Sequence, residues 1–311
     1  MASFSRCTSI LRAFSRILPA GKLVFCCVAV FVLTAGCGRG ELPRSTAVRD
    51  DFGNEVVPGA ARRIISLNPA TTEMLFAIGA GSRVIGRTTW DSYPDSARLV
   101  PDMGPGLRPN LEVVIGAEPD LVILYASADN RPAADRLRSL GIATLAVKND
   151  SIGDLARTLR LLGIVTGDSA RAAAVGDSVR VTLERVRAAT AGREQPSAFW
   201  YIWDSPLITI GRGSYMSELL DIAGARNLYD DIARPSPTVT LEDVVRRNPD
   251  VVIAGPDGTK DLRGDARWSA LPAVKAGRII IADTALVAKP SVRLGEAAVS
   301  LARALHPGIE L

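Results

Sequence analysis

The 311-residue chain has four cysteines, and none of them lies after Cys37. Most of the sequence therefore has neither a disulfide framework nor a cysteine metal site. It has a single histidine, His306, which stands beside Pro307 near the C-terminus, where we expect a surface or helix-capping role. A transition-metal site made of the usual ligands is thus excluded.

Motifs of catalysis are also missing. The sequence contains no Gly-x-Ser-x-Gly turn, no His-Glu-x-x-His pair and no phosphate-binding loop. Gly211-Arg212-Gly213-Ser214 follows an expected strand but lacks the third glycine and the downstream acid of a dinucleotide-binding fingerprint. We therefore expect neither an enzyme nor a cofactor. The alternative, a nucleotide-dependent α/β enzyme, would need a phosphate-binding loop and the N-terminus of a cytoplasmic protein.

The charge balance argues against a polyanion as partner. The chain has 37 lysines and arginines against 33 aspartates and glutamates. Four of the basic residues and none of the acids precede Cys37, so the remainder carries 33 of each and no net charge. Nucleic-acid-binding proteins keep a basic excess, and we expect no nucleic-acid partner.

The N-terminus has the pattern of an export signal. Basic residues up to Lys22 precede an apolar run over residues 23–33, and Thr34-Ala35-Gly36-Cys37 follows. As a helix this run is about 17 Å long, short of the roughly 30 Å hydrocarbon core of a bilayer. The small residues before Cys37 fit a lipobox, in which that cysteine is acylated. We predict a lipoprotein signal peptide over residues 1–36 and an anchor to membrane lipid through Cys37. An ordinary signal peptide or an N-terminal membrane anchor is the alternative.

One stretch of the sequence occurs twice. A Leu-Glu pair opens a short amphipathic pattern at residue 111 and again at residue 241, and each time a Pro-Asp turn and an apolar strand follow. A second echo pairs Thr72-Glu73-Met74-Leu75 with Ser217-Glu218-Leu219-Leu220. A chain that repeats such units in the same order is expected to form two similar lobes that face each other across a cleft.

Strands and helices alternate through both halves. In the first half we expect strands over residues 64–67, 83–87, 121–124 and 142–147, and helices over residues 71–78, 111–115 and 131–140. This alternation predicts mostly parallel sheets. The predicted fold class is α/β: two similar lobes with mostly parallel sheets, joined by a long helical linker.

Between the two predicted lobes, from residue 151 to about residue 190, the sequence has helical periodicity and no strand pattern. Gly167-Asp168 has the pattern of a C-cap glycine followed by an N-cap, so the linker is either two helices or one bent helix. Such a linker limits hinge motion more than a Gly/Ser linker does. We expect a monomer. Its predicted parts are a signal peptide (residues 1–36), a tether with a short hairpin and an entry strand (37–61), a first lobe (62–150), a helical linker (151–195) and a second lobe (196–311).

Aromatic side chains make up only 5 % of the chain, yet four stand at or just past the ends of expected strands. They are Trp90, Tyr93, Tyr125 and Trp203. Because ligands of open α/β lobes bind at the carboxyl ends of strands, rigid rings at these positions suit a flat, bulky ligand. Tyr93, which precedes Pro94, is the one that we expect to be structural.

The run Ser66-Leu67-Asn68-Pro69-Ala70-Thr71-Thr72-Glu73 and the paired Leu-Glu helices resemble the helical-backbone solute-binding proteins of ABC importers. Members of that family deliver cobalamin, iron siderophores or haem. The likeness runs from about Arg62 to the C-terminus and is greatest for the cobalamin-binding members. It implies a periplasmic or extracytoplasmic lipoprotein that captures cobalamin or a related corrinoid and hands it to the membrane permease without a reaction.

The resemblance also assigns roles to individual residues. In that family a glutamate on each lobe engages arginines of the permease, and the matching positions here are Glu112 and Glu242. The alternative is that both only stabilise the first turns of their helices. Trp90, Tyr125 and Trp203 match aromatic pocket residues of the cobalamin-binding members, and Asp283 matches a polar contact of the second lobe.

Two departures from the family pattern leave the ligand open. Gly106 and Ser236 stand near positions where tryptophans are expected. A ferric siderophore or haem is therefore the alternative ligand. Candidate partners for an anionic siderophore are Arg87, Arg108 and Arg212, and Tyr125 is a candidate iron ligand for haem.

Overall fold

A computed structural model describes residues 48–311, so the expected signal peptide and Cys37 lie outside the described residues. The first sheet is wholly parallel and has the strand order β2-β1-β3-β4. Its strands are β1 (Ile64–Leu67), β2 (Val84–Gly86), β3 (Leu121–Tyr125) and β4 (Ala143–Val147). The predicted strand at residues 83–87 is shorter in the structure, because Gly81–Arg83 forms a 3-10 turn.

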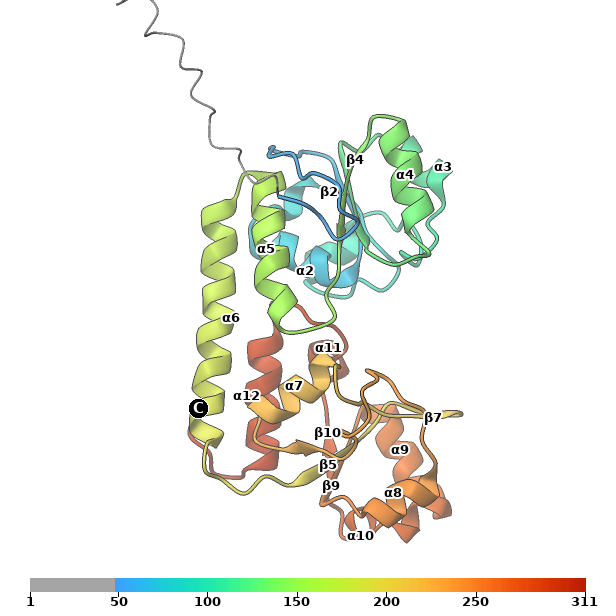
Figure 1. The fold of residues 1–311 in the computed structure, drawn as a ribbon, viewed down its shortest axis with the longest axis vertical. Coiled ribbons are helices and arrows are strands. Elements are labelled where there is room, and N and C mark those ends of the chain that lie inside the picture. The colour runs from blue at the N-terminus through green and yellow to red at the C-terminus, as the bar shows by residue number, and fades with distance from the viewer. Residues whose placement is uncertain (1–47) are drawn as a thin grey trace, which may run out of the picture. The chain divides into compact units, whose positions relative to one another are not determined.

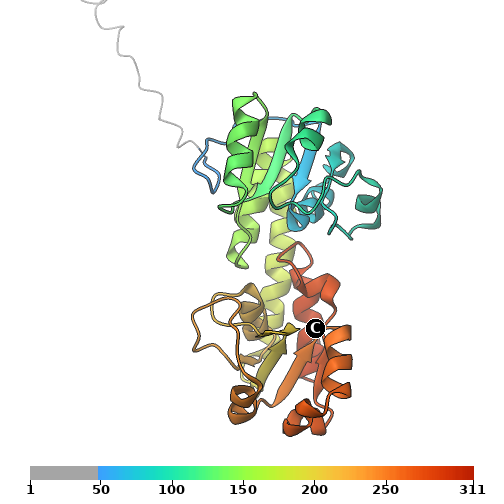
Figure 2. The same cartoon turned by 90° about the vertical axis from the view of Figure 1, so that its right-hand side faces the viewer.

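The second sheet repeats this topology. It is also parallel, with the order β10-β9-β5-β8, so in both sheets the first strand of the lobe lies between its second and third. The strands are β5 (Ser197–Tyr201), β8 (Arg226–Asn227), β9 (Val251–Ala254) and β10 (Ile279–Ile281). An additional antiparallel pair, β6 (Trp203–Asp204) and β7 (Leu207–Ile208), follows β5. The predicted fold class, two similar α/β lobes with parallel sheets, is confirmed (Figures 1 and 2).

The helices repeat as the sequence predicted. α2 (Pro69–Ala77) and α3 (Leu111–Gly116) correspond to α7 (Tyr215–Ile222) and α8 (Leu241–Arg247). α2 begins two residues before the predicted start, because the side chain of Asn68 accepts a hydrogen bond from the Ala70 amide and caps the helix. Further helices are α4 (Arg131–Ser139), α9 (Pro256–Gly264), α10 (Pro272–Lys275), α11 (Thr284–Val287) and α12 (Leu294–Leu305). Asp95–Leu99 and Ala266–Ala270 are 3-10 turns.

Two long helices connect the sheets. α5 (Gly153–Thr166) packs against α6 (Ser169–Thr190), and α6 also packs against α7 and α12 (Figure 1). Gly167 is left-handed, with φ of 76°, so the predicted C-cap glycine is confirmed. Asp168 is the N-cap residue of α6, as predicted, but its carboxylate makes no capping hydrogen bond and instead pairs with Arg83 at 3.0 Å. None of the helices in residues 48–311 is long and apolar enough to cross a membrane.

The core divides according to the two faces of each sheet. Ile64 of β1 and Trp200 of β5 face the helices α5, α6 and α12 and share one large cluster with them. Their neighbours Ile65 and Phe199 point to the opposite faces and join separate clusters, one in each lobe. Each sheet thus has one face on the shared helical cluster and one face on a core of its own lobe.

The predicted short hairpin before the first lobe is present. Arg49 and Glu55 form an antiparallel bridge, and the Asp50 carboxylate accepts hydrogen bonds from the amides of Phe52 and Asn54. The Asp51 amide donates to Ala146 O at 2.9 Å, which fastens the hairpin to the edge strand β4. The described part of the tether therefore packs on the first lobe.

His306 stands at the C-cap of α12, which agrees with one of its two expected roles. The other role, a surface position, is wrong. The ring is buried, and Nε2 lies 3.2 Å from Gly224 O at the end of α7. The histidine thus joins two helices of the second lobe.

Candidate functional site

A pocket of about 530 Å³ lies between the two lobes. Its first-lobe wall consists of residues at or after the carboxyl ends of β1, β2, β3 and β4: Asn68, Trp90, Tyr125 and Asn149 among others. The second-lobe wall is the segment around α11, which includes Thr284, Ala288 and Lys289. The carboxyl end of a parallel sheet is where α/β proteins bind ligands, so this position makes the pocket the candidate site.

The structure brings two of the four predicted ligand residues into this pocket. Trp90 is 65 % exposed, and Tyr125 is partly buried beside it in the pocket wall. Trp203 does not line the pocket: it is 62 % exposed on β6, and its Nε1 donates to Ser205 O at 3.0 Å. Asp283 is also outside the lining. Its carboxylate accepts from the Ala285 amide at 2.8 Å and caps α11, next to the wall residue Thr284.

The phenol of Tyr125 is held by an acid. Its hydroxyl donates to Asp150 Oδ1 at 2.6 Å. Burial, and after it this hydrogen bond, raises the pKa of Tyr125 well above its ordinary value. The side chain is therefore a neutral hydrogen-bonding ring at physiological pH.

The three arginines considered for an anionic siderophore do not form a cluster in the pocket. None of them lines it. Arg87 pairs with Asp102 at 3.7 Å and donates to Thr88 O, and Arg108 pairs with Asp129 at 2.8 Å. Arg212 is exposed in the second lobe.

The conformation of Gly106 explains why no tryptophan stands at this position. Its φ is +85°, and a Cβ at this position would lie 2.6 Å from Leu67 O and 2.9 Å from Thr88 Cγ2. A side chain cannot be placed there without moving the end of β1. The Gly106 carbonyl also accepts a hydrogen bond from Asn130 Nδ2 at 3.2 Å, so the glycine serves the packing of the first lobe.

Tyr93 has the structural role that its place before Pro94 predicted. The guanidinium carbon of Arg293 lies 3.9 Å from the centre of the Tyr93 ring, so an arginine of the second lobe stacks on a ring of the first. Tyr93 is not among the residues that line the pocket.

The sequence-based interpretation missed a buried ion cluster beside the pocket. Glu73 of α2 has a wholly buried side chain, and Oε1 lies 2.9 Å from Lys289 Nζ and 3.4 Å from Arg293 Nη2. Ser291 Oγ donates to the same carboxylate. The signal that could have revealed the cluster is the acid itself, since Glu73 stands between buried neighbours of an otherwise uncharged helix.

The predicted docking glutamates occupy equivalent places. Glu112 and Glu242 are each the second residue of a short helix, and both side chains are exposed. Neither carboxylate has an ion-pair partner within residues 48–311. Asn110 accepts from the amides of Glu112 and Val113, and Thr240 accepts from the amide of Asp243, so each helix already has a side-chain cap. Figure 1 draws α3 and α8 on the side of the molecule away from α6.

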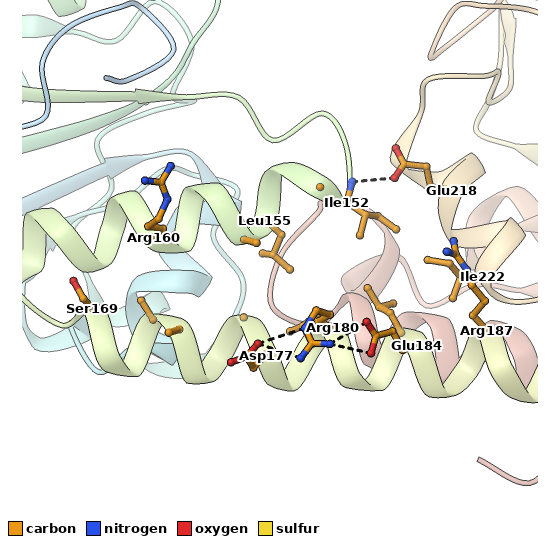
Figure 3. A pocket seen from close by; sticks show the side chains of 17 residues that line it. Ile152, Leu155, Arg160, Ser169, Asp177, Arg180, Glu184, Arg187, Glu218 and Ile222 are labelled. Carbon is orange, nitrogen blue, oxygen red and sulfur yellow. Dashed lines mark hydrogen bonds and ion pairs between the residues drawn. The ribbon is translucent and has the colours of Figure 1, made fainter. Parts of the chain in front are cut away.

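A second cavity, of about 650 Å³, lies among α5, α6 and α7 (Figure 3). Its floor is apolar, with Leu155, Leu183 and Ile222. At its rim, Arg180 contacts Glu184 at 2.9 Å and Asp177 at 3.3 Å. It has no aromatic lining. The pocket between the lobes is therefore the better ligand site. No group of three or more histidine, aspartate or glutamate side chains that could hold a metal occurs in the described chain.

The chain is similar in sequence to known binding proteins. A family model described as periplasmic binding protein matches residues 64–286. An uncharacterized ABC transporter substrate-binding lipoprotein of Bacillus subtilis (strain 168), YvrC, is 30% identical over 300 residues, which cover 89% of this chain and 94% of YvrC. The vitamin B12-binding protein of Salmonella paratyphi A is 29% identical over 212 residues, 68% of this chain and 79% of that protein.

Solved structures share the fold. The periplasmic vitamin B12 binding protein BtuF of Vibrio cholerae superposes with a TM-score of 0.71 at 23% identity, over 80% of this chain and 98% of BtuF. The periplasmic heme-binding protein RhuT of Roseiflexus sp. RS-1 also has a TM-score of 0.71, at 21% identity, over 79% of this chain and 100% of RhuT. The fold is thus equally similar to a vitamin B12 carrier and to a haem carrier.

Proposed function

The chain belongs to the periplasmic binding protein family as a substrate-binding protein of an ABC transporter, and we propose that its ligand is cobalamin or a related corrinoid. The observation that carries this proposal is the position of Trp90 and Tyr125 in the pocket between the lobes. Rigid aromatic rings offer a large contact area to a flat macrocycle at little cost in side-chain entropy. The sequence likeness to a vitamin B12-binding protein supports the same ligand.

Members of the family are binding proteins and not enzymes. The proposed mechanism is accordingly capture and release. The ligand enters between the first lobe (residues 62–150) and the second lobe (residues 196–311), and the helical linker (residues 151–195) restrains the opening of the lobes. Trp203 and Asp283, which lie outside the pocket lining, are proposed contacts for the part of a bulky ligand that extends beyond the pocket.

Delivery requires a membrane partner. We propose that the exposed carboxylates of Glu112 and Glu242 dock the protein, as a monomer, on the ABC permease. Two equivalent acids on two similar lobes suit a partner with two-fold symmetry. The proposed anchor is the acylated Cys37, outside the described residues, which holds the protein at the membrane on the extracytoplasmic side. The relative YvrC carries the name of a lipoprotein, which supports this anchor.

Haem or a ferric siderophore is the second candidate ligand. The structural likeness to a haem-binding protein favours haem. Against it, the Tyr125 hydroxyl already donates to Asp150, and His306 is buried in the second lobe at the end of α12. Against an anionic siderophore, the three candidate arginines lie outside the pocket lining.

A titration of the purified protein separates these candidates. We expect cyanocobalamin to bind one per chain in calorimetry, with a matching change in its visible absorbance. Haem and a ferric catecholate serve as competing probes under the same conditions. Saturable binding of either, without a cobalamin signal, would transfer the assignment to that ligand.

A further inference from the structure

Two hydrogen-bond donors at the wall of the ligand pocket have unused capacity. The Lys289 ammonium has three N–H donors, and its one partner within residues 48–311 is the carboxylate of Glu73. Asn149 is buried, with 7 % of its surface exposed, and its Oδ1 accepts from Thr158 Oγ1 at 2.7 Å. Its Nδ2 has no hydrogen-bond partner in the described chain. Both residues line the pocket, one from each lobe.

Lys289 is also the one charged side chain in the described lining of the pocket. The remaining wall residues are aromatic, aliphatic, amide or hydroxyl side chains. A buried or half-buried donor without a partner costs free energy, and an acceptor on the ligand removes that cost. A negatively charged acceptor is the strongest partner for an ammonium group.

The ion cluster fixes the position of this lysine. The Lys289 side chain is 15 % exposed, and Glu73 holds it from the opposite lobe at 2.9 Å. Arg293 and Ser291 contact the same carboxylate, so Glu73 stays paired if Lys289 is removed. Asp91, the buried neighbour of Trp90 in the chain, also interacts electrostatically with Lys289, although burial raises the pKa of that aspartate. Two cations, Lys289 and Arg293, thus share the buried carboxylate of Glu73.

We infer that Lys289 determines ligand specificity by binding an anionic group of the ligand, and that Glu73 is its positioning residue. This inference rests on the proposed capture of a macrocycle. The anion is a phosphodiester if the ligand is a corrinoid with its nucleotide loop. It is a propionate carboxylate if the ligand is haem. In both cases the Lys289 ammonium donates hydrogen bonds to the oxygens of the anion.

The internal repeat offers a matched control for this role. Glu218 occupies in α7 the place that Glu73 occupies in α2, and it also reaches across the molecule. Its Oε2 accepts from the Ile152 amide at 3.3 Å, at the start of α5 (Figure 3). Glu218 lines the cavity of the connecting helices and not the ligand pocket. A change there tests interlobe structure without touching Lys289.

The experiment compares ligands with and without the anion. Cobinamide has the corrin ring but lacks the phosphate-bearing nucleotide loop of cobalamin. For Lys289→Met we expect the Kd for cobalamin to rise about tenfold or more and the Kd for cobinamide to change less than about twofold. Lys289→Arg should retain most of the preference for cobalamin. Glu73→Gln should reduce the preference as well, whereas Glu218→Gln should leave both affinities unchanged.

The outcomes separate this inference from the proposed function. If Lys289→Met weakens cobalamin and cobinamide equally, or weakens neither, the role of Lys289 is disproved while corrinoid binding stands. If the wild-type protein binds haem and no corrinoid, the proposed function fails. The role of Lys289 is then tested by the Kd values for haem and for its dimethyl ester, measured in the wild-type protein and in Lys289→Met. A wild-type protein that binds none of the four probes overturns both.

Discussion

The ammonium nitrogen of Lys289 lies 2.9 Å from Oε1 of Glu73, and this ion pair joins the second lobe to the first. The carboxylate is wholly buried, so its charge depends on the cations and the hydroxyl that surround it. Arg293 extends the junction, because it contacts both Glu73 and the ring of Tyr93. The lobe boundary beside the ligand pocket is therefore held by charge as well as by the connecting helices.

Replacing Glu73 by glutamine should destabilise the protein. Lys289 and Arg293 would lose the acid that neutralises them in a poorly solvated place, and breaking a buried pair in this way costs about 3 kcal/mol. Urea denaturation followed by circular dichroism measures the loss. The control is Glu218→Gln, in which an amide oxygen can still accept from the Ile152 amide, and we expect less than about 1 kcal/mol there. Equal losses in the free energy of unfolding would show that Glu73 contributes no more to stability than Glu218 does.

Trp90→Ala should weaken cobalamin binding by on the order of 1–3 kcal/mol, or about ten- to a hundredfold. The exposed ring lines the pocket, so its removal takes away contact area without disturbing the core. Trp203→Ala should have a smaller effect, because Trp203 lies outside the lining. Calorimetry gives the affinities.

Tryptophan fluorescence provides a second measurement. Trp200 and Trp268 are buried in the second lobe and supply a background that both variants keep. Cobalamin should quench the wild-type protein, and Trp90→Ala should lose part of that quenching. Unchanged affinity and unchanged quenching in Trp90→Ala would remove this residue from the proposed site.

The repeated α/β architecture could be predicted because its signals are local. A Leu-Glu pair, a Pro-Asp turn and an apolar strand are each written within a few residues, and the two copies gave the matching helices α3 and α8. Gly167 could be predicted as a C-cap for the same reason, since only a glycine adopts φ of 76° without strain. The N-cap position of Asp168 could also be predicted, but the partner of its carboxylate could not, because Arg83 lies far away in the sequence.

The pocket shows the same limit. Trp90 and Tyr125 could be placed near strand ends from the alternation of strands and helices alone. The cluster at Glu73 could not, since Ser291 approaches it from 218 residues later in the chain. The strand pattern also does not predict which aromatic residues near a strand end reach the pocket. Trp203 instead donates a hydrogen bond to Ser205 O on its own hairpin.

Cys37→Ser tests the proposed anchor. A serine cannot carry the thioether-linked lipid, so we expect the variant protein to appear in the soluble fraction or to remain an uncleaved precursor. Each acyl methylene that leaves the membrane removes about 0.8 kcal/mol of binding, which is large when summed over whole chains. Fractionation and immunoblotting measure the outcome. Processing and membrane retention equal to the parent protein would disprove the lipobox interpretation.

Reversing the charge at both docking positions should abolish uptake and leave ligand affinity unchanged. Glu112 and Glu242 are exposed, have no ion-pair partner within residues 48–311, and are absent from the pocket lining. One exposed pair contributes only about 0.2–1 kcal/mol, so a single neutral substitution should merely weaken transport. In Glu112→Arg/Glu242→Arg, like charges would face the arginines proposed on the permease, which costs several kcal/mol.

The matched control is Glu194→Arg/Glu310→Arg, which reverses two exposed acids after α6 and α12 and changes the net charge equally. Whole-cell uptake of labelled cobalamin and calorimetry of the purified variants give the two quantities. A loss of uptake in both double variants would indicate a non-specific effect of charge. Normal uptake in Glu112→Arg/Glu242→Arg would mean that the permease does not read these positions, and since Asn110 and Thr240 already cap the two helices, the acids would then serve only the helix dipoles.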